Sequence, residues 1–194
     1  MHITHQLIGQ IAGVIAFLSI WPYVISILKG HTKPSRSAYA IWALVEVVTA
    51  VTYIASGARS TIWVILTWAF SAVLIFILSI KYGMGGHSKL DLTCLAIALI
   101  AITIWITTKS PIAALYASII AGKLSYLPII KKSYLTPETE NTLSWGMVVF
   151  AAILNLFALT TLRPAISILP ISGAIIEGTV FILLILPRQR KLNR

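Results

Sequence analysis

Charged side chains are scarce in this sequence, and acidic ones are the scarcest. Only 10% of the 194 residues are charged, with 5 Asp and Glu against 15 Lys and Arg. Water-soluble domains carry about 25% charged residues, so this deficit excludes an ordinary soluble domain. Hydrophobic residues make up 58% of the chain, which points to a protein surrounded by lipid.

Residues and motifs that often carry catalysis or hold a metal are also sparse. The single cysteine, Cys94, lies inside an apolar run and has no partner for an internal disulfide. The 4 histidines, His2, His5, His31 and His87, stand near the N-terminus or in loops, without the spacing of metal ligands. The sequence contains no glycine-rich phosphate loop and no nucleophile motif. We therefore expect no enzymatic activity, no cofactor and no metal site.

Long apolar runs, in contrast, are abundant. Seven of them approach or exceed the ~20 residues with which a helix crosses a bilayer. They cover residues 6–28, 37–57, 61–81, 90–108, 111–131, 142–161 and 164–187. The connections between them are too short for a soluble domain. The sequence therefore predicts an all-α membrane protein with seven transmembrane helices.

Along the chain, connections that are rich in Lys and Arg alternate with connections that are poor in them. With the N-terminus outside, eleven fall in cytoplasmic segments and three in outer loops. The cytoplasmic ones are Lys29, Lys33, Arg36, Lys81, Lys89, Lys131, Lys132, Arg188, Arg190, Lys191 and Arg194, and the outer ones are Arg59, Lys109 and Arg163. This bias follows the positive-inside rule and predicts a cytoplasmic C-terminus, in the plasma (inner) membrane if the source is prokaryotic. It also accounts for the net charge of +10 as a topology signal that contacts anionic lipid, so we expect no nucleic-acid partner.

The two halves of the chain repeat a pattern of serine, proline and tryptophan. Leu18-Ser19-Ile20-Trp21-Pro22 in the first run and Leu124-Ser125-Tyr126-Leu127-Pro128 in the fifth both read L-S-x-x-P. A second proline follows in each basic connection, Pro34 or Pro137, eight residues before Trp42 or Trp145. Two further apolar runs then follow in each half. The pattern predicts two parallel three-helix repeats, residues 1–89 and 110–194, joined by a linker helix in residues 90–109.

At these positions the sequence resembles the PQ-loop and SWEET-type transporter family. Pro22-Tyr23 with the following Lys29, Thr32 and Lys33 looks like a first PQ-loop, and Pro128 with Lys131, Lys132 and Pro137 looks like a second. The plan of three, one and three helices is similar too, so the resemblance covers nearly the whole chain. It implies alternating-access movement of a small solute, with Pro22 and Pro128 as hinges.

The sequence departs from the family at two kinds of position. The glutamine that follows the proline in the family is replaced by Tyr23 in one half and by Ile129 in the other. The paired asparagines that SWEET sugar carriers place in the third helix of each repeat are missing, with Thr67 and Ser172 near those positions. These departures weaken the expectation of a sugar substrate more than that of a transporter scaffold.

The two prolines also have a physical consequence that is independent of any family. A proline inside a helix leaves the carbonyl four residues earlier without its donor, here that of Leu18 or Leu124. In a bilayer a neighbouring group must satisfy this carbonyl, and Ser19 and Ser125 are close enough to help. A static kink is one interpretation. A moving hinge is favoured, because the kink recurs at matched sites.

Three ionisable residues, Glu46, Lys123 and Glu177, fall inside apolar runs, where an unpaired charge is costly and often functional. Lys123 and Glu177 stand 12 and 13 residues past Pro111 and Pro164, so at ~1.5 Å per residue both lie near mid-membrane. They form either a structural ion pair or part of a solute site. Glu46 has no opposite charge in its own repeat, which favours a proton-titrating or substrate-facing role over packing.

Four further residues complete the predicted site. Tyr53 follows Glu46 by two helical turns on one face, and Asn155 takes the corresponding place in the second half. Trp42 and Trp145 stand near the cytoplasmic mouth, either as gates or as membrane anchors. The predicted substrate-binding set is Glu46, Tyr53, Lys123, Asn155 and Glu177.

These features together predict a small-solute carrier, a uniporter or a proton-coupled porter, with a mid-membrane site between the repeats. The expected partners are a small polar solute, protons and membrane lipid, and homo-oligomerisation stays open. The first alternative is a non-transporting membrane receptor or trafficking protein on the same scaffold. A seven-helix photoreceptor is disfavoured, because Lys123 lies in the fifth run whereas a retinal lysine usually lies in the last.

Overall fold

A computed structural model describes residues 2–34, 36–83, 85, 89–135, 137 and 140–186 of the chain. Within these ranges the protein is helical and contains no β-strand. The helices are α1 (His2–Leu28), α2 (Arg36–Ala55), α3 (Ile62–Tyr82), α4 (Lys89–Thr108), α5 (Pro111–Leu124), α6 (Leu127–Leu135), α7 (Thr142–Phe157) and α8 (Pro164–Ile185). The predicted all-α class is confirmed.

Four helices, α1, α2, α3 and α8, are long and apolar enough to cross a membrane. Shorter apolar helices cover Leu95–Thr108, Pro111–Leu124 and Thr142–Phe157. The outer surface is apolar as well. On α1, for example, Leu7, Ile11, Val14 and Leu18 are exposed at the spacing that places side chains on one helix face. Soluble proteins rarely expose such contiguous apolar patches, so these features indicate a membrane protein.

Local sequence explains where several helices begin and end. Ser110 and Asn141 cap α5 and α7, since each side chain accepts a hydrogen bond from a backbone N–H of the first turn. Pro111 and Pro164 occupy the first turns of α5 and α8, where a missing N–H costs no helical hydrogen bond. After α2 the chain turns at Gly57, whose φ of 97° is accessible to glycine without strain.

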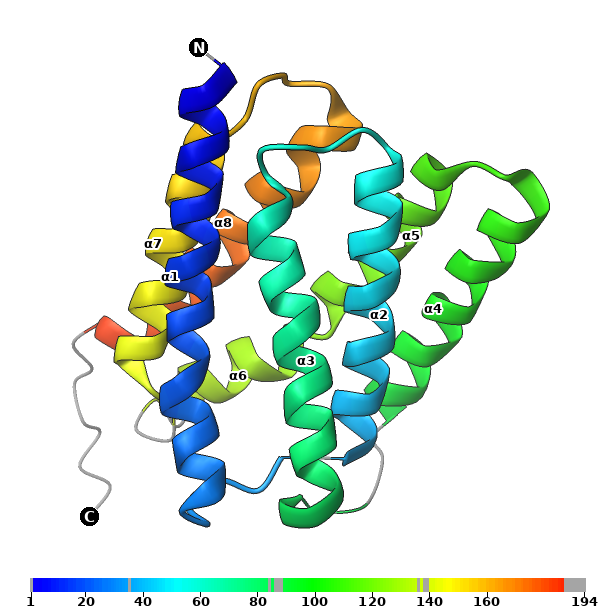
Figure 1. The fold of residues 1–194 in the computed structure, drawn as a ribbon. Helices are drawn as coiled ribbons and strands as arrows, with labels where there is room; N and C mark the ends of the chain where they lie inside the picture. Colours follow the sequence, from blue (N-terminus) through cyan, green and yellow to red (C-terminus); the bar gives the residue numbers. More distant parts are fainter. Residues whose placement is uncertain are drawn as a thin grey trace.

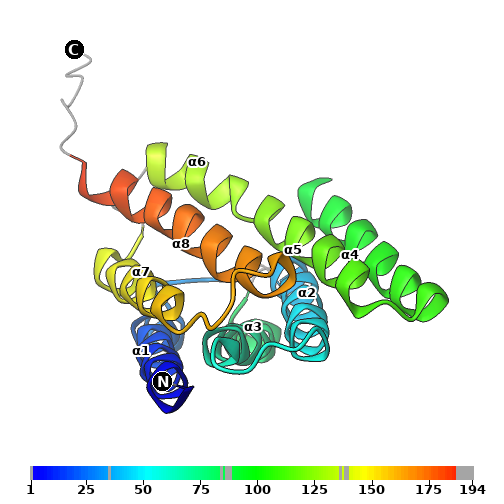
Figure 2. The same cartoon turned by 90° about the horizontal axis from the view of Figure 1, so that it is seen from above.

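The helices pack as two sets. α3 lies between α1 and α2, and α8 lies between α7 and the segment formed by α5 and α6. Between the sets, α1 packs against α7 and α2 packs against α5, while α4 packs against α5 and α2. Figure 1 shows α1, α2, α3 and α7 running in similar directions, with α8, α5 and α6 behind them. Figure 2 shows α8 running side by side with the segment formed by α5 and α6. The helix neighbours of the two sets match when α1 is paired with α5–α6, α2 with α7 and α3 with α8. For example, α3 packs against α1 and α2 as α8 packs against α5–α6 and α7.

The fifth apolar run is not one continuous helix, so the prediction of an uninterrupted helix over residues 111–131 is wrong. α5 ends at Leu124, Ser125 and Tyr126 form a turn, and α6 begins at Leu127. Pro128 is therefore the second residue of a helix, where proline is tolerated, whereas Pro22 lies inside the unbroken α1. The two matched prolines have different local structures.

The two serines that precede the prolines donate hydrogen bonds to the helix backbone, but not to the Leu18 and Leu124 carbonyls that the sequence predicted. Ser19 Oγ donates to the Ala16 carbonyl at 2.6 Å, and Ser125 Oγ donates to the Gly122 carbonyl at 2.6 Å. Each hydroxyl reaches three residues back along its own helix, rather than to the carbonyl four residues before the proline. The two halves thus share this hydrogen bond even though their backbones differ.

Successive connections lie at alternate ends of the molecule (Figure 1). The N-terminus and the α2–α3, α4–α5 and α7–α8 connections lie at one end, which we call the far end. The α1–α2 connection, the end of α3 and the starts of α4 and α7 lie at the opposite end, which we call the basic end because Lys29 and Lys33 belong to that connection and Lys89 begins α4.

Candidate functional site: a cavity between the two helix sets

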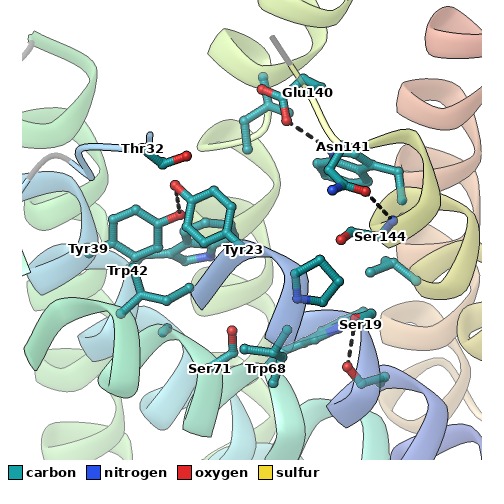
Figure 3. Close-up of a pocket in the computed structure, with 18 of the residues that line it drawn as sticks. Ser19, Tyr23, Thr32, Tyr39, Trp42, Trp68, Ser71, Glu140, Asn141 and Ser144 are labelled. Carbon is teal, nitrogen blue, oxygen red and sulfur yellow. Dashed lines mark hydrogen bonds between the residues drawn. The ribbon is translucent and has the colours of Figure 1, made fainter. Parts of the chain in front are cut away.

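A cavity of about 530 Å³ lies between the two helix sets. Thr32, Glu140 and Asn141 from connections at the basic end form its mouth, and Ser71 and Trp68 of α3 lie on the opposite side (Figure 3). The cavity thus runs from the basic end into the middle of the molecule. Its volume falls in the range of small-molecule sites, about 300–1,000 Å³.

Five aromatic rings follow one another along the cavity wall, and we call them the aromatic row. Ring centroids are 6.3 Å apart for Tyr23 and Tyr39, 5.5 Å for Tyr39 and Trp42, 5.9 Å for Trp42 and Tyr126, and 6.4 Å for Tyr126 and Trp145. The Tyr39 hydroxyl also donates to the Tyr23 hydroxyl at 3.1 Å. The row runs from α1 through α2 and the α5–α6 turn to α7, so both helix sets contribute to it.

Two carboxylates line the cavity, and each is held by one of the matched tryptophans. Trp42 Nε1 donates to Glu46 Oε1 at 3.0 Å, and Trp145 Nε1 donates to Glu140 Oε2 at 3.1 Å. Glu140 stands at the mouth. Glu46 lies deeper and is only 7% exposed, so its carboxylate is largely removed from bulk water. The two indoles therefore orient one carboxylate at the entrance and one in the interior.

Lys123 lies behind this wall between two buried carboxylates. Its ammonium is close enough to Glu46 and to Glu177 to interact electrostatically with both. A Cβ built on Gly173 would lie 3.9 Å from both Lys123 Nζ and Glu177 Oε1, so both groups lie close to this glycine. Glu177 is 0% exposed, and its carboxyl group interacts with the Tyr126 hydroxyl as well as with Lys123. The Lys123–Glu177 pair considered from the sequence thus belongs to a cluster of three ionisable groups.

Tyr53 and Asn155, two other predicted binding residues, do not line the cavity. The Tyr53 hydroxyl is buried, donates to the Ile166 carbonyl at 2.6 Å and lies 2.6 Å from Thr61 Oγ1. Asn155 is 5% exposed, and its Oδ1 has no hydrogen-bond partner in the described part of the chain. The structure therefore separates these two side chains from Glu46.

Contacts between the helix sets close the far end, and we call them the far-end closure. Besides the bond from Tyr53 in α2 to Ile166 in α8, Ser60 Oγ donates to the Ala158 carbonyl at 2.6 Å. Within the first set, the backbone of α1 packs against the α2–α3 connection at Gly9, where an added Cβ would overlap the Ser60 carbonyl. The cavity is thus open toward the basic end and closed toward the far end.

No protein-family model, curated protein or solved structure matches the chain. The function is therefore inferred from the geometry of the site itself.

Gly9→Ala is expected to lower the melting temperature Tm, because the methyl group would overlap the Ser60 carbonyl and overpacking costs ~1–3 kcal/mol. Gly178→Ala in α8 is the matched control, since nothing lies within 4 Å of its would-be Cβ and alanine is the better helix former. Thermal unfolding of both variants in one detergent measures the difference. A wild-type Tm for Gly9→Ala would contradict close packing at the far end.

Of the predicted residues, Pro22, Trp42, Glu46 and Trp145 line the cavity, and Lys123 and Glu177 adjoin it. The side chain of Pro128 lies outside the described residues.

Sequence reasoning missed Tyr39, Tyr126 and Glu140 as lining residues. Tyr39 precedes Trp42 by three residues on one helix face, and this spacing could have identified it. Tyr126 stands inside the repeated L-S-x-x-P pattern. Glu140 is one of only 5 acidic residues, but it stands in a connection whose path the sequence leaves open.

Proposed function

We propose that this protein is a small-solute transporter that works by alternating access, as a uniporter or a proton-coupled carrier, and that it is not an enzyme. The observation that carries this proposal is the cavity between the helix sets, open at one end and closed at the other by contacts between the sets. A carrier needs such a site, reached from one side at a time and bounded by two bodies that can rock against each other.

In this proposal the chain forms seven transmembrane spans as three plus one plus three. α1–α3 form the first repeat, α4 is the linker, and α5–α6, α7 and α8 form the second. The resemblance to PQ-loop and SWEET-type transporters and the exchangeable helix neighbours support this plan. α5 and α6 would form one interrupted span whose break, at Ser125 and Tyr126, adjoins the cavity. Many transporters place the breaks of discontinuous helices at the solute site.

The proposed topology places the basic end in the cytoplasm. In a Cys94→Ala background, Arg59→Cys and Arg163→Cys are expected to react with a membrane-impermeant maleimide added to intact cells. Lys33→Cys and Lys89→Cys are expected to react only after permeabilisation. All four side chains are exposed, so burial does not limit the reaction. Labelling of residues 33 and 59 from the same side would contradict the seven-span topology.

The transport proposal is tested by finding a ligand and following it across a membrane. A thermal-shift screen of small metabolites is expected to yield ligands that raise the Tm of the wild type and of Ile77→Phe, where the side chain is 57% exposed on the outer surface of α3. They should not raise the Tm of Ser71→Phe, whose ring would fill part of the cavity. The same ligands are then expected to exchange across proteoliposomes that contain wild-type protein. A ligand that binds the cavity but never crosses would favour the receptor or trafficking alternative.

A further inference from the structure

The charges around the cavity are unlike those of the whole chain. Lys and Arg outnumber Asp and Glu by 15 to 5. Nevertheless, two of the acidic residues, Glu46 and Glu140, line the cavity, and no Lys, Arg or His of the described ranges does. The charged groups on the described wall of the cavity are therefore both carboxylates, although the chain as a whole is basic. Such a cavity is electrostatically suited to a cation.

The buried cluster beside the cavity leaves room for one more positive charge. Lys123 is the basic group that interacts with both Glu46 and Glu177, so two buried carboxyl groups share one positive partner. A buried charge without a partner is strongly unfavourable. Glu46 accepts one hydrogen bond from Trp42, and no second donor to it is found within the described ranges. A cationic group in the cavity next to Glu46 would give this carboxyl group a positive partner of its own.

The aromatic row supplies the other half of a cation site. Ammonium groups are attracted to the faces of Trp and Tyr rings within about 6 Å, and quaternary ammonium ligands are recognised by aromatic cages. The protein contains an internal example of this contact. Lys123 Nζ lies 5.6 Å from the ring centroids of both Trp68 and Tyr126, and both rings line the cavity. The same rings can therefore accept a second ammonium group from the cavity side.

We propose that the cavity binds a small organic monocation, an alkylated or quaternary ammonium group, between Glu46 and the aromatic row. A ligand without a carboxylate of its own fits best, because the described wall holds no Lys, Arg or His to pair with one. The inference rests on the proposed function only in taking this cavity as the solute site.

The test compares charged and uncharged ligands of the same shape. Tetramethylammonium, choline and benzyltrimethylammonium are titrated calorimetrically into the full chain in detergent, together with the alcohol in which a tert-butyl group replaces the trimethylammonium group of choline. At least one cation is expected to bind saturably, and the alcohol is expected to bind about tenfold more weakly than choline. Equal binding of choline and the alcohol, or no saturable binding of any cation at millimolar concentration, would overturn the proposal.

Variants place the site within the molecule. Glu46→Gln is expected to weaken cation binding about tenfold and to leave binding of the alcohol unchanged, because only the charge is removed. Trp145→Leu is expected to weaken cation binding, Trp145→Phe to retain most of it, and Trp21→Leu, exposed on α1, to have no effect. Wild-type cation binding by both Glu46→Gln and Trp145→Leu would show that the site lies elsewhere.

The outcome for transport is separate, because binding is measured without a membrane. A cation that binds with these dependences but does not enter proteoliposomes supports the cation site and removes the transporter. If a neutral solute is transported while no cation binds, the transporter proposal is supported and the cation site is contradicted.

Discussion

Glu46→Gln is expected to abolish pH-dependent or uphill accumulation of the solute while sparing solute exchange, provided that exchange is measured at solute concentrations that saturate the variant. Exchange needs no net proton movement, whereas proton-driven accumulation needs a group in the solute site that takes up and releases a proton. Glu46 is the deep carboxylate of the cavity, and glutamine keeps its shape and can still accept the hydrogen bond from Trp42 Nε1. Uptake into proteoliposomes with and without an imposed pH gradient, beside counterflow at equal pH, measures both activities.

Glu140→Gln is the matched control for this experiment. It also removes a cavity carboxylate that accepts a bond from a tryptophan, but at the mouth, so pH-dependent accumulation should persist. If Glu46 has only a structural role, Glu46→Gln should lower the Tm and leave the pH dependence of the remaining activity unchanged. Wild-type pH dependence in Glu46→Gln would remove proton coupling through this residue and leave a facilitator.

The helices could be predicted from the sequence because apolar runs in lipid have few other ways to satisfy their backbone. The run predicted over residues 37–57 corresponds to α2 (Arg36–Ala55), and that over residues 61–81 corresponds to α3 (Ile62–Tyr82). The fifth run could not be predicted in the same way. The break at Ser125 and Tyr126 lies in an apolar stretch, and hydropathy carries no information on backbone direction. A proline that begins a helix also looks the same in sequence as one that kinks it.

The site could be predicted in part, because a polar residue in an apolar run is costly unless the fold uses it. This reasoning found Glu46, Lys123 and Glu177. Tyr53 was placed with Glu46 because they share a helix face, but seven residues advance a helix by about 10 Å, and at that distance Tyr53 joins the far-end closure. Helical periodicity gives the face of a residue, while the depth of a cavity depends on how helices from the two halves pack.

Lys123→Met is expected to be the most destabilising single change in the charge cluster. It leaves Glu46 and Glu177 buried without the positive group that interacts with both. Removing one partner of a buried ion pair costs about 3–5 kcal/mol, and here two carboxylates lose their partner at once. Glu177→Gln should be milder, because Lys123 still faces Glu46. The Tm of each purified variant, measured in one detergent, ranks the variants by the stability that they lose.

A double-glutamine background separates charge from packing at Lys123. With Glu46→Gln and Glu177→Gln both present, Lys123→Met should cost much less than in the wild type, because no ionised carboxylate is left behind. Lys29→Met, at an exposed position of the basic end, is the control and should change stability by no more than about 0.5 kcal/mol. An equal loss of Tm for Lys123→Met in the wild type and in the double-glutamine background would show that Lys123 stabilises the protein by packing on Trp68 and Tyr126, with no share from the two carboxylates. A smaller loss in that background would mean that the three charges act as a unit, and that any ligand or proton bound at Glu46 also changes the balance at Glu177.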